Sequence, residues 1–252
     1  MTSSAFARPP EVRNAREAVA RLADKGPHEV LRGDLGMVGV PGVVFAPAEG
    51  LGLPAVAFGH DWLQPVGRYT GLLRHLASWG IVVAAPDSQR GPLPSHARFA
   101  ADLVTALAGH GIGGGAALLA AADTPTLSAL VTIAVAQTRP SALDAARRVT
   151  TPTLHIAAGR DMVSPAAGHA EPIAAAAAGP VWLRTLRKAE HTGFLDGRHW
   201  SDVVLSGSPN AKTRQLTRAF VTAFLLHHLT GEDRADVLVD GQVKGTDLLT
   251  RS

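Results

Sequence analysis

A glycine-rich run, one acid and one histidine form the strongest chemical pattern in this sequence. Gly109-His110-Gly111-Ile112-Gly113 follows a short apolar run and precedes an alanine-rich stretch, as a strand, a tight turn and a helix would. Turns of the pattern G-x-S-x-G hold a nucleophilic serine, and Gly111 stands in the serine position. Asp161 and His191 come later, each after an apolar run. In this order an acid can orient an imidazole that takes the proton of a nucleophile.

Each part of the pattern also has a plainer interpretation. A glycine-rich turn before a helix can bind phosphate through its backbone N–H groups, although no Gly-Lys-Ser/Thr follows this one. It can also be a tight connection without any ligand. Asp161 alone could cap the next helix, and His191 is one of 11 histidines. The order of the three features and their places after predicted strands favour the triad arrangement.

The missing hydroxyl limits the chemistry that we expect. Gly111 carries no nucleophile, the motif offers neither Asp nor Cys in its place, and the chain contains no cysteine. Glycine is expected on both sides of this position, because the strand and helix backbones of such a turn approach too closely for side chains. Ser95, Ser164 and Ser201 are remote alternatives, since none of them lies in a turn of this kind.

A parallel sheet would bring the acid, the histidine and the glycine turn to one edge. Short β-branched runs alternate with helical stretches, which predicts an α/β fold with a mostly parallel, doubly wound sheet flanked by helices. The predicted strands are residues 42–46, 55–59, 81–86, 103–107, 130–134, 153–157 and 181–186. The predicted helices are residues 11–23, 69–79, 113–122, 166–178 and 212–229.

Composition narrows the class of protein. The chain has 252 residues, of which 46% are hydrophobic and 18% charged, so we expect one domain over residues 1–252. Residues 1–27 would form an N-terminal helical extension and residues 230–252 a C-terminal tail. The net charge is only +3 and the arginines are dispersed, which argues against nucleic-acid binding. The adjacent pair His227-His228 lacks the spacing of a helical metal site, and no motif implies a metal or a cofactor.

The sequence also predicts where the protein works. No apolar run reaches the roughly 20 residues needed to span a bilayer, so no membrane span is expected. Residues 1–25 contain scattered charges and lack the apolar core of a secretory signal. We therefore expect a cytoplasmic protein.

Several segments resemble the dienelactone-hydrolase and polyester-hydrolase branch of the α/β-hydrolases, which is cutinase-like and PET-hydrolase-like. They are Ala57-Phe58-Gly59-His60-Asp61-Trp62, Leu76-Ala77-Ser78-Trp79-Gly80-Ile81-Val82-Val83, the glycine turn, residues 152–165 and residues 189–194. The resemblance extends over about residues 42–229. It implies the α/β-hydrolase fold and a relation to carboxylic-ester hydrolases.

The resemblance also implies roles for residues around the missing serine. In that family an oxyanion is held by two backbone N–H groups, which correspond to those near Asp61 and of Ile112. Trp62 and Phe194 would line the acyl pocket, and His60 is a candidate substrate contact because it borders the oxyanion loop. The path of about twenty residues from Pro86 to the turn is shorter than in relatives, yet it exceeds the roughly 10–12 residues that a parallel crossover needs.

Three functions follow from a triad without its serine. The first is a pseudo-hydrolase that binds an ester-like or lipid-like small molecule, or a protein partner, without turning it over. The second is a weak esterase or lactonase in which His191, oriented by Asp161, activates a water. The third is an esterase in which Gly111 is an inactivating substitution, natural or engineered. Loss of the nucleophile costs a serine hydrolase on the order of a million-fold in turnover, which favours the first.

Overall fold

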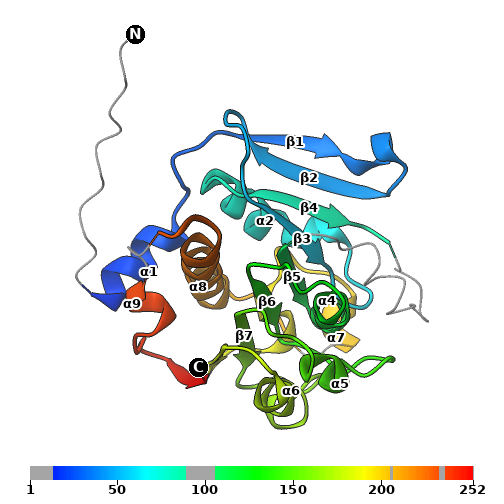
Figure 1. The fold of residues 1–252 in the computed structure, drawn as a ribbon, viewed down its shortest axis with the longest axis vertical. Helices are drawn as coiled ribbons and strands as arrows, with labels where there is room; N and C mark the ends of the chain where they lie inside the picture. Colours follow the sequence, from blue (N-terminus) through cyan, green and yellow to red (C-terminus); the bar gives the residue numbers. More distant parts are fainter. Residues whose placement is uncertain (1–13, 89–105, 205–206, 233–235, 252) are drawn as a thin grey trace.

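The computed structural model describes residues 14–88, 106–204, 207–232 and 236–251. Nine strands in these residues form one sheet with the order β1-β2-β4-β3-β5-β6-β7-β8-β9 (Figure 1). The strands from β4 to β8 pair in parallel, whereas β1, β2 and β9 pair antiparallel at the two edges. The predicted architecture, a mostly parallel sheet flanked by helices, is confirmed.

All seven predicted strands are present, with one displaced. The strands are β1 Val30–Asp34, β2 Gly42–Pro47, β3 Ala55–Gly59, β4 Val82–Pro86, β5 Ala106–His110, β6 Leu130–Ile133, β7 Thr153–Ala158, β8 Val181–Leu186 and β9 Thr246–Arg251. β5 was predicted at residues 103–107, of which 103–105 lie outside the described residues. The strand extends to His110 because Leu107 to His110 pair in register with β6, a tertiary contact that outweighs the low strand propensity of Ala and Gly.

The predicted helices are also present, and one of them is broken; residues 11–13 of the first predicted helix lie outside the described residues. The α-helices are α1 Ala15–Ala23, α2 Thr70–Ser78, α4 Ile112–Ala122, α5 Ala142–Ala146, α6 Ala170–Ala176, α7 Ser201–Val204, α8 Ala211–Thr230 and α9 Asp236–Val239. Short 3-10 turns are η1 Leu35–Val38, η2 Val66–Tyr69, η3 Ala166–Gly168 and η4 His191–Phe194. The helix predicted at residues 166–178 divides into η3 and α6, because His169 has non-helical dihedrals and its ring accepts the Gln137 N–H.

Helices cover both faces of the sheet. One core contains the buried sides of α1, α2 and α8, and a second core contains those of α4, α5 and α6 (Figure 1). Residues of β3 alternate between the two cores: Val56 and Phe58 belong to the first, and Ala57 to the second. The central strands are therefore apolar on both faces, which is the expected pattern for a covered parallel sheet.

The predicted C-terminal tail, residues 230–252, contains α9 and the edge strand β9. Arg184 of β8 explains its position: the guanidinium is buried and donates to the carbonyl oxygens of Leu238, Val239 and Gly241 and to the Thr246 hydroxyl. It also lies 4.3 Å from the centre of the Phe220 ring. At the other end of the chain, α1 packs against α8. None of the helices in the described ranges has the length and hydrophobicity required for a transmembrane segment.

Candidate functional site

Four strands deliver the predicted site residues to one edge of the sheet. Asp61 follows β3, Gly111 follows β5, Asp161 follows β7, and His191 begins η4 after β8. These strands run parallel, so their carboxyl ends meet at the same edge, where α/β sheets place their ligands. The structure thus brings together the glycine turn, the acid and the histidine.

The turn at Gly111 has the geometry that the motif predicts. Gly111 adopts φ 54° and ψ −121° between β5 and α4, a conformation that is strained for residues with a side chain. A Cβ at Gly109 would overlap the Gly113 carbonyl oxygen, and a Cβ at Gly113 would overlap that of Gly59. Glycine at both flanking positions is therefore required by the close approach of strand and helix.

A carboxylate fills the position of the missing serine. A Cβ added to Gly111 would overlap Oδ1 and Cγ of Asp61 and would lie 2.7 Å from its Oδ2. The motif itself contains no substitute for the serine, and the side chain that takes up its space comes from outside the motif. The motif does not reveal this carboxylate, because Asp61 belongs to the loop after a different strand. The available signal was an acid in the oxyanion loop combined with a glycine in the serine position.

His191 lies between two carboxylates. Its Nε2 is 2.8 Å from Asp61 Oδ2, and its Nδ1 is 2.8 Å from Asp161 Oδ2. All three side chains are buried. The second oxygen of Asp161 accepts the backbone N–H groups of Val163 and Ser164, so Asp161 caps this short turn and does not cap α6. We call Asp61, His191 and Asp161 the buried triad.

Mutual attraction keeps the buried triad ionised. Burial alone would raise the pKa of Asp61, but the charge and hydrogen bond of His191 lower that pKa to about 2. Burial alone would lower the pKa of His191, but the two carboxylates raise it to about 10. The pKa of Asp161 is also lowered: burial alone would raise it, but the hydrogen bond and charge of His191 and the backbone N–H groups of Ser164 and Val163 together outweigh that cost. At neutral pH the centre is therefore carboxylate, imidazolium and carboxylate.

The two expected oxyanion donors already have acceptors. The Ile112 N–H donates to Asp61 Oδ1 at 2.9 Å, and the Asp61 N–H donates to the Tyr69 hydroxyl at 3.0 Å. A catalytic oxyanion hole needs donors that point at an unoccupied position where charge develops. In this structure the Asp61 side chain takes one donor and Tyr69 takes the other.

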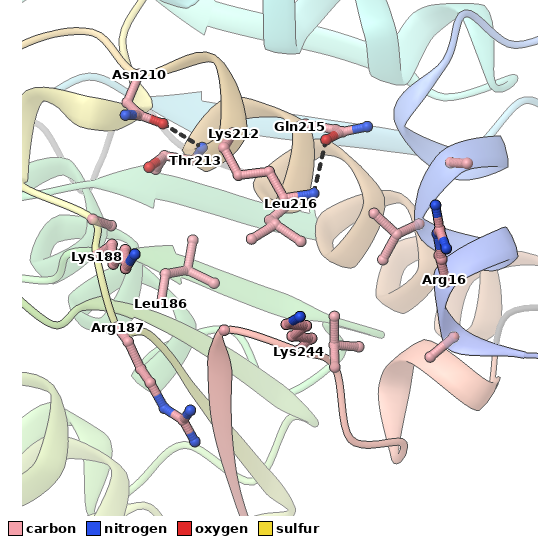
Figure 2. Close-up of a pocket in the computed structure, with 16 residues that line it drawn as sticks. Arg16, Leu186, Arg187, Lys188, Asn210, Lys212, Thr213, Gln215, Leu216 and Lys244 are labelled. Carbon is pink, nitrogen blue, oxygen red and sulfur yellow. Dashed lines mark hydrogen bonds between the residues drawn. The ribbon is translucent and has the colours of Figure 1, made fainter.

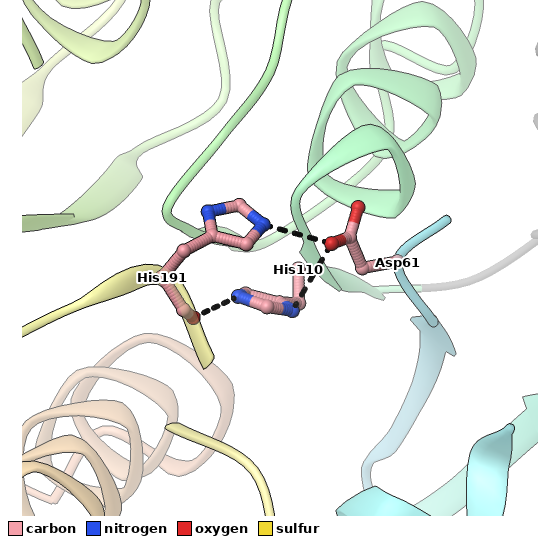
Figure 3. Close-up of side chains that lie close together, drawn as sticks. All are labelled: Asp61, His110 and His191. Atoms are coloured by element: carbon pink, nitrogen blue, oxygen red, sulfur yellow. Dashed lines mark hydrogen bonds and ion pairs between the residues drawn. The ribbon is translucent and has the colours of Figure 1, made fainter. Parts of the chain in front are cut away.

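His110 and Tyr69 complete the network beneath the triad. His110 Nε2 faces the His191 carbonyl oxygen at 3.1 Å (Figure 3), so it carries the ring proton and Nδ1 accepts the Tyr69 hydroxyl at 2.9 Å. Burial lowers the pKa of His110 to about 4, which keeps the ring neutral. Asp61, His110 and His191 place ligand atoms within 4.8 Å of one another, as a metal site would. Hydrogen-bond partners already engage each of these atoms.

The other predicted substrate contacts are buried or half-buried side chains. His60 is 1% exposed, and its two ring nitrogens face the backbone oxygens of Asp61 and Ser88. The Phe194 ring is buried with its centre 5.6 Å from that of His110. Trp62 is half-buried, and its Nε1 has no acceptor among the described residues.

Ser164 and Ser201, the two remote serines among the described residues, do not replace the missing nucleophile beside Nε2 of His191. Ser164 is buried behind the triad and lies 3.2 Å from Nδ1 of His191, the nitrogen that faces Asp161. Ser201 bonds to Gln64 and His199 in a separate network. Ser95 lies outside the described residues.

Two cavities lie away from the buried triad. The larger, of about 750 Å³, lies between α1, α8 and the ends of β8 and β9, and the smaller, of about 330 Å³, lies beside α2. Asp61, Gly111, His191, Trp62 and Phe194 line neither of them.

Comparison with known proteins identifies a partial match. Residues 74–180 match a family model described as PET hydrolase-like. The matched segment includes Gly111 and Asp161, and it ends before His191 and begins after Asp61. A search of curated proteins finds no match. Together with the mostly parallel sheet, the family match shows an α/β-hydrolase fold that is related to ester hydrolases.

Proposed function

We propose that this chain is a pseudo-hydrolase, in which the position of a serine nucleophile has become a buried ion triad. One observation carries the proposal: the Asp61 carboxylate occupies the space of a side chain at Gly111 and accepts the Ile112 N–H. A serine ester hydrolase needs a hydroxyl at that point and a free oxyanion donor beside it. Neither is present, so acyl-enzyme formation on serine is not expected.

The ionisation of His191 weakens the case for an activated water. A general base needs a free lone pair and works best with a pKa near the operating pH. His191 lies between two carboxylates, which raise its pKa to about 10. Each ring nitrogen then donates a proton to a carboxylate. Water activation by His191 and Asp161 would require this imidazolium to lose a proton first.

The fit between Asp61 and Gly111 argues against an accidental loss of serine. A simple deletion of the hydroxymethyl group would leave a gap beside His191. Here the Asp61 carboxylate fills it and bonds to both Ile112 and His191. Glycine at this position is the only residue type without the Cβ that would overlap Asp61. The two residues depend on each other, so we interpret them as a matched pair.

The same geometry supports a second candidate, a carboxylate-dependent hydrolase. Asp61 is anionic, and one of its oxygens lies against the His191 imidazolium. Carboxylates can act as nucleophiles. Asp61 would attack the acyl carbon and form an anhydride, while His191 protonates the departing alcohol. Water would then cleave the anhydride: its oxygen bonds to the acyl carbon, one of its protons leaves with the carboxylic acid product, the other returns to His191, and Asp61 departs as a carboxylate.

Hydrolysis of p-nitrophenyl butyrate by the parent and its variants tests these proposals. We expect the parent and Gly111→Ser to be inactive, the latter because Asp61 overlaps the new side chain. The double variant Asp61→Gly with Gly111→Ser clears that space and frees the Ile112 N–H. We expect it to gain at least about 100-fold over the parent. Adding His191→Ala should abolish the gain, and a serine-reactive phosphonate should label only the active variant.

Other outcomes would change the assignment. Ester turnover by the parent that disappears in both Asp61→Asn and His191→Ala would reject the pseudo-hydrolase and support the carboxylate mechanism. Activity in Gly111→Ser alone would show that Asp61 does not hold the serine position. Thermal melting of each variant separates loss of activity from loss of the fold.

A further inference from the structure

The larger cavity combines an apolar floor with a cationic rim. Its floor is formed by buried side chains from α1, α8, β8, the loop after β8 and the turn before β9, namely Val19, Leu186, Ala189, Thr213, Leu216 and Val243. Figure 2 shows Leu186 and Leu216 projecting into the space between these elements. The volume of about 750 Å³ falls in the range of about 300–1,000 Å³ typical of small-molecule sites.

Positive charge gathers around this floor. The rim consists of exposed cations from four separate segments, namely Arg16, Arg187, Lys188, Lys212 and Lys244 (Figure 2). No acidic residue lines the cavity among the residues that the structure describes. For a chain with a net charge of only +3, this is a marked local excess of positive charge.

Most of the rim charge is not neutralised by the protein. Arg187 pairs with Asp247 outside the cavity lining. Lys212 donates to the neutral Gln215, so its charge remains available. Arg16, Lys188 and Lys244 form no ion pair within the described part of the chain. An anion entering the cavity would therefore meet four cations without a competing carboxylate in the lining.

We propose that this cavity binds a single-chain amphiphile with a carboxylate head, such as a long-chain fatty acid. The apolar floor would bury the chain, and the rim would hold the carboxylate by charge-assisted hydrogen bonds. The described lining contains no aromatic side chain, so it offers no stacking surface for a nucleotide base. The site is separate from the buried triad, and the proposal stands whether or not the protein turns over esters.

Calorimetric titration with dodecanoate, below its micelle concentration, tests the proposal on the full chain. We expect saturable binding of one dodecanoate per chain, at least about tenfold tighter than dodecanol, with affinity that falls as salt is added. The double variant Lys188→Glu with Lys244→Glu should weaken dodecanoate binding at least about tenfold. Arg32→Glu, on β1 at the opposite edge of the sheet, makes the same type of charge change and should leave the affinity unchanged.

A separate variant tests the apolar floor of the cavity. Leu216→Asp places a charge where the chain would lie, and it should abolish binding of dodecanoate while a melting curve verifies the fold. Equal affinity for dodecanoate and dodecanol would overturn the proposal. So would dodecanoate binding that is unaffected by reversal of Lys188 and Lys244. Binding to anionic phosphatidylglycerol vesicles that dodecanoate does not compete with would instead assign the rim to a membrane surface.

Discussion

The buried triad and the cationic cavity use charge in opposite ways. In the triad, His191 is enclosed by two carboxylates, and the backbone donors that could hold a ligand already bond to protein atoms. Around the cavity, Arg16, Lys188 and Lys244 are exposed and lack ion pairs among the described residues. The charges of the triad are therefore neutralised within the protein, whereas these cations around the apolar cavity are not. We therefore expect a ligand to bind at the cationic cavity and not at the buried triad.

Removing one charge from each region should give the largest difference in the free energy of unfolding. His191→Ala leaves two buried carboxylates facing a gap, and we expect it to lower the free energy of unfolding by about 3–5 kcal/mol. Lys188→Ala removes an exposed rim charge, and we expect a change within about 0.5 kcal/mol. Urea-induced unfolding at neutral pH measures both. Similar losses for the two variants would mean that the triad contributes no more to stability than a surface cation.

Two glycines allow a finer comparison of the same regions. Gly111 and Gly245 both have positive φ, 54° and 87°, so Ala at either position meets backbone strain of about 1–2 kcal/mol. A Cβ at Gly245, on the cavity wall, meets nothing within 4 Å, whereas one at Gly111 overlaps Asp61. We expect Gly111→Ala to cost at least about 2 kcal/mol more in unfolding free energy.

A second substitution shows whether the overlap is the cause. In the Asp61→Ala background the carboxylate is absent, so the additional cost of Gly111→Ala should fall to about that of Gly245→Ala. Denaturant unfolding of the double variant measures this coupling. If Gly111→Ala costs as much unfolding free energy without the Asp61 carboxylate as with it, backbone strain alone is the cause and the overlap is not.

The smallest effect, counted for each pH unit, is a slope of stability with pH. The pKa of His191 is about 10 in the folded protein and about 6.5 when unfolded, so the folded state binds the additional proton between these values. The stabilisation is complete below about pH 6.5 and is lost as the pH rises towards about 10, by about 1.4 kcal/mol for each pH unit. Denaturant unfolding at a series of pH values should show this slope in the parent and in Lys188→Ala.

Neutralising one carboxylate should move the pH range over which stability is lost. Asp61→Asn removes one of the charges that raise the pKa of His191, so the loss of stability should end at a lower pH. Constant stability of the parent between pH values of about 7 and 9 would contradict the ionised triad.

The two regions also differ in how far the sequence predicts them. Short apolar runs predicted the central strands, because strands covered on both faces need such residues. The edge strands β1, Val-Leu-Arg-Gly-Asp, and β9, Thr-Asp-Leu-Leu-Thr-Arg, are mostly exposed, so no continuous apolar run marks them. They depend on pairing with β2 and β8, which is information from elsewhere in the chain.

The candidate site shows the same limit. Strand context and chain order placed Asp161 beside His191, and the motif placed Gly111 at the turn. The sequence assigned Asp61 only a backbone role, because its loop was known but its side-chain direction was not. That direction depends on the gap at Gly111, on the Ile112 N–H and on the charge of His191. These contacts come from residues that follow two other strands, β5 and β8. The residues around position 61 therefore cannot predict where the Asp61 side chain points.

The buried guanidinium of Arg184 has a consequence for the order of events during synthesis. Its acceptors are the oxygens of residues 238–246, and β9, which pairs with β8, is the last of the described strands to leave the ribosome. Until then, β8 presents an open edge, and a charge that belongs in the protein interior lacks its acceptors. The β8 side of the sheet is therefore complete only after residues 238–251 have folded onto it.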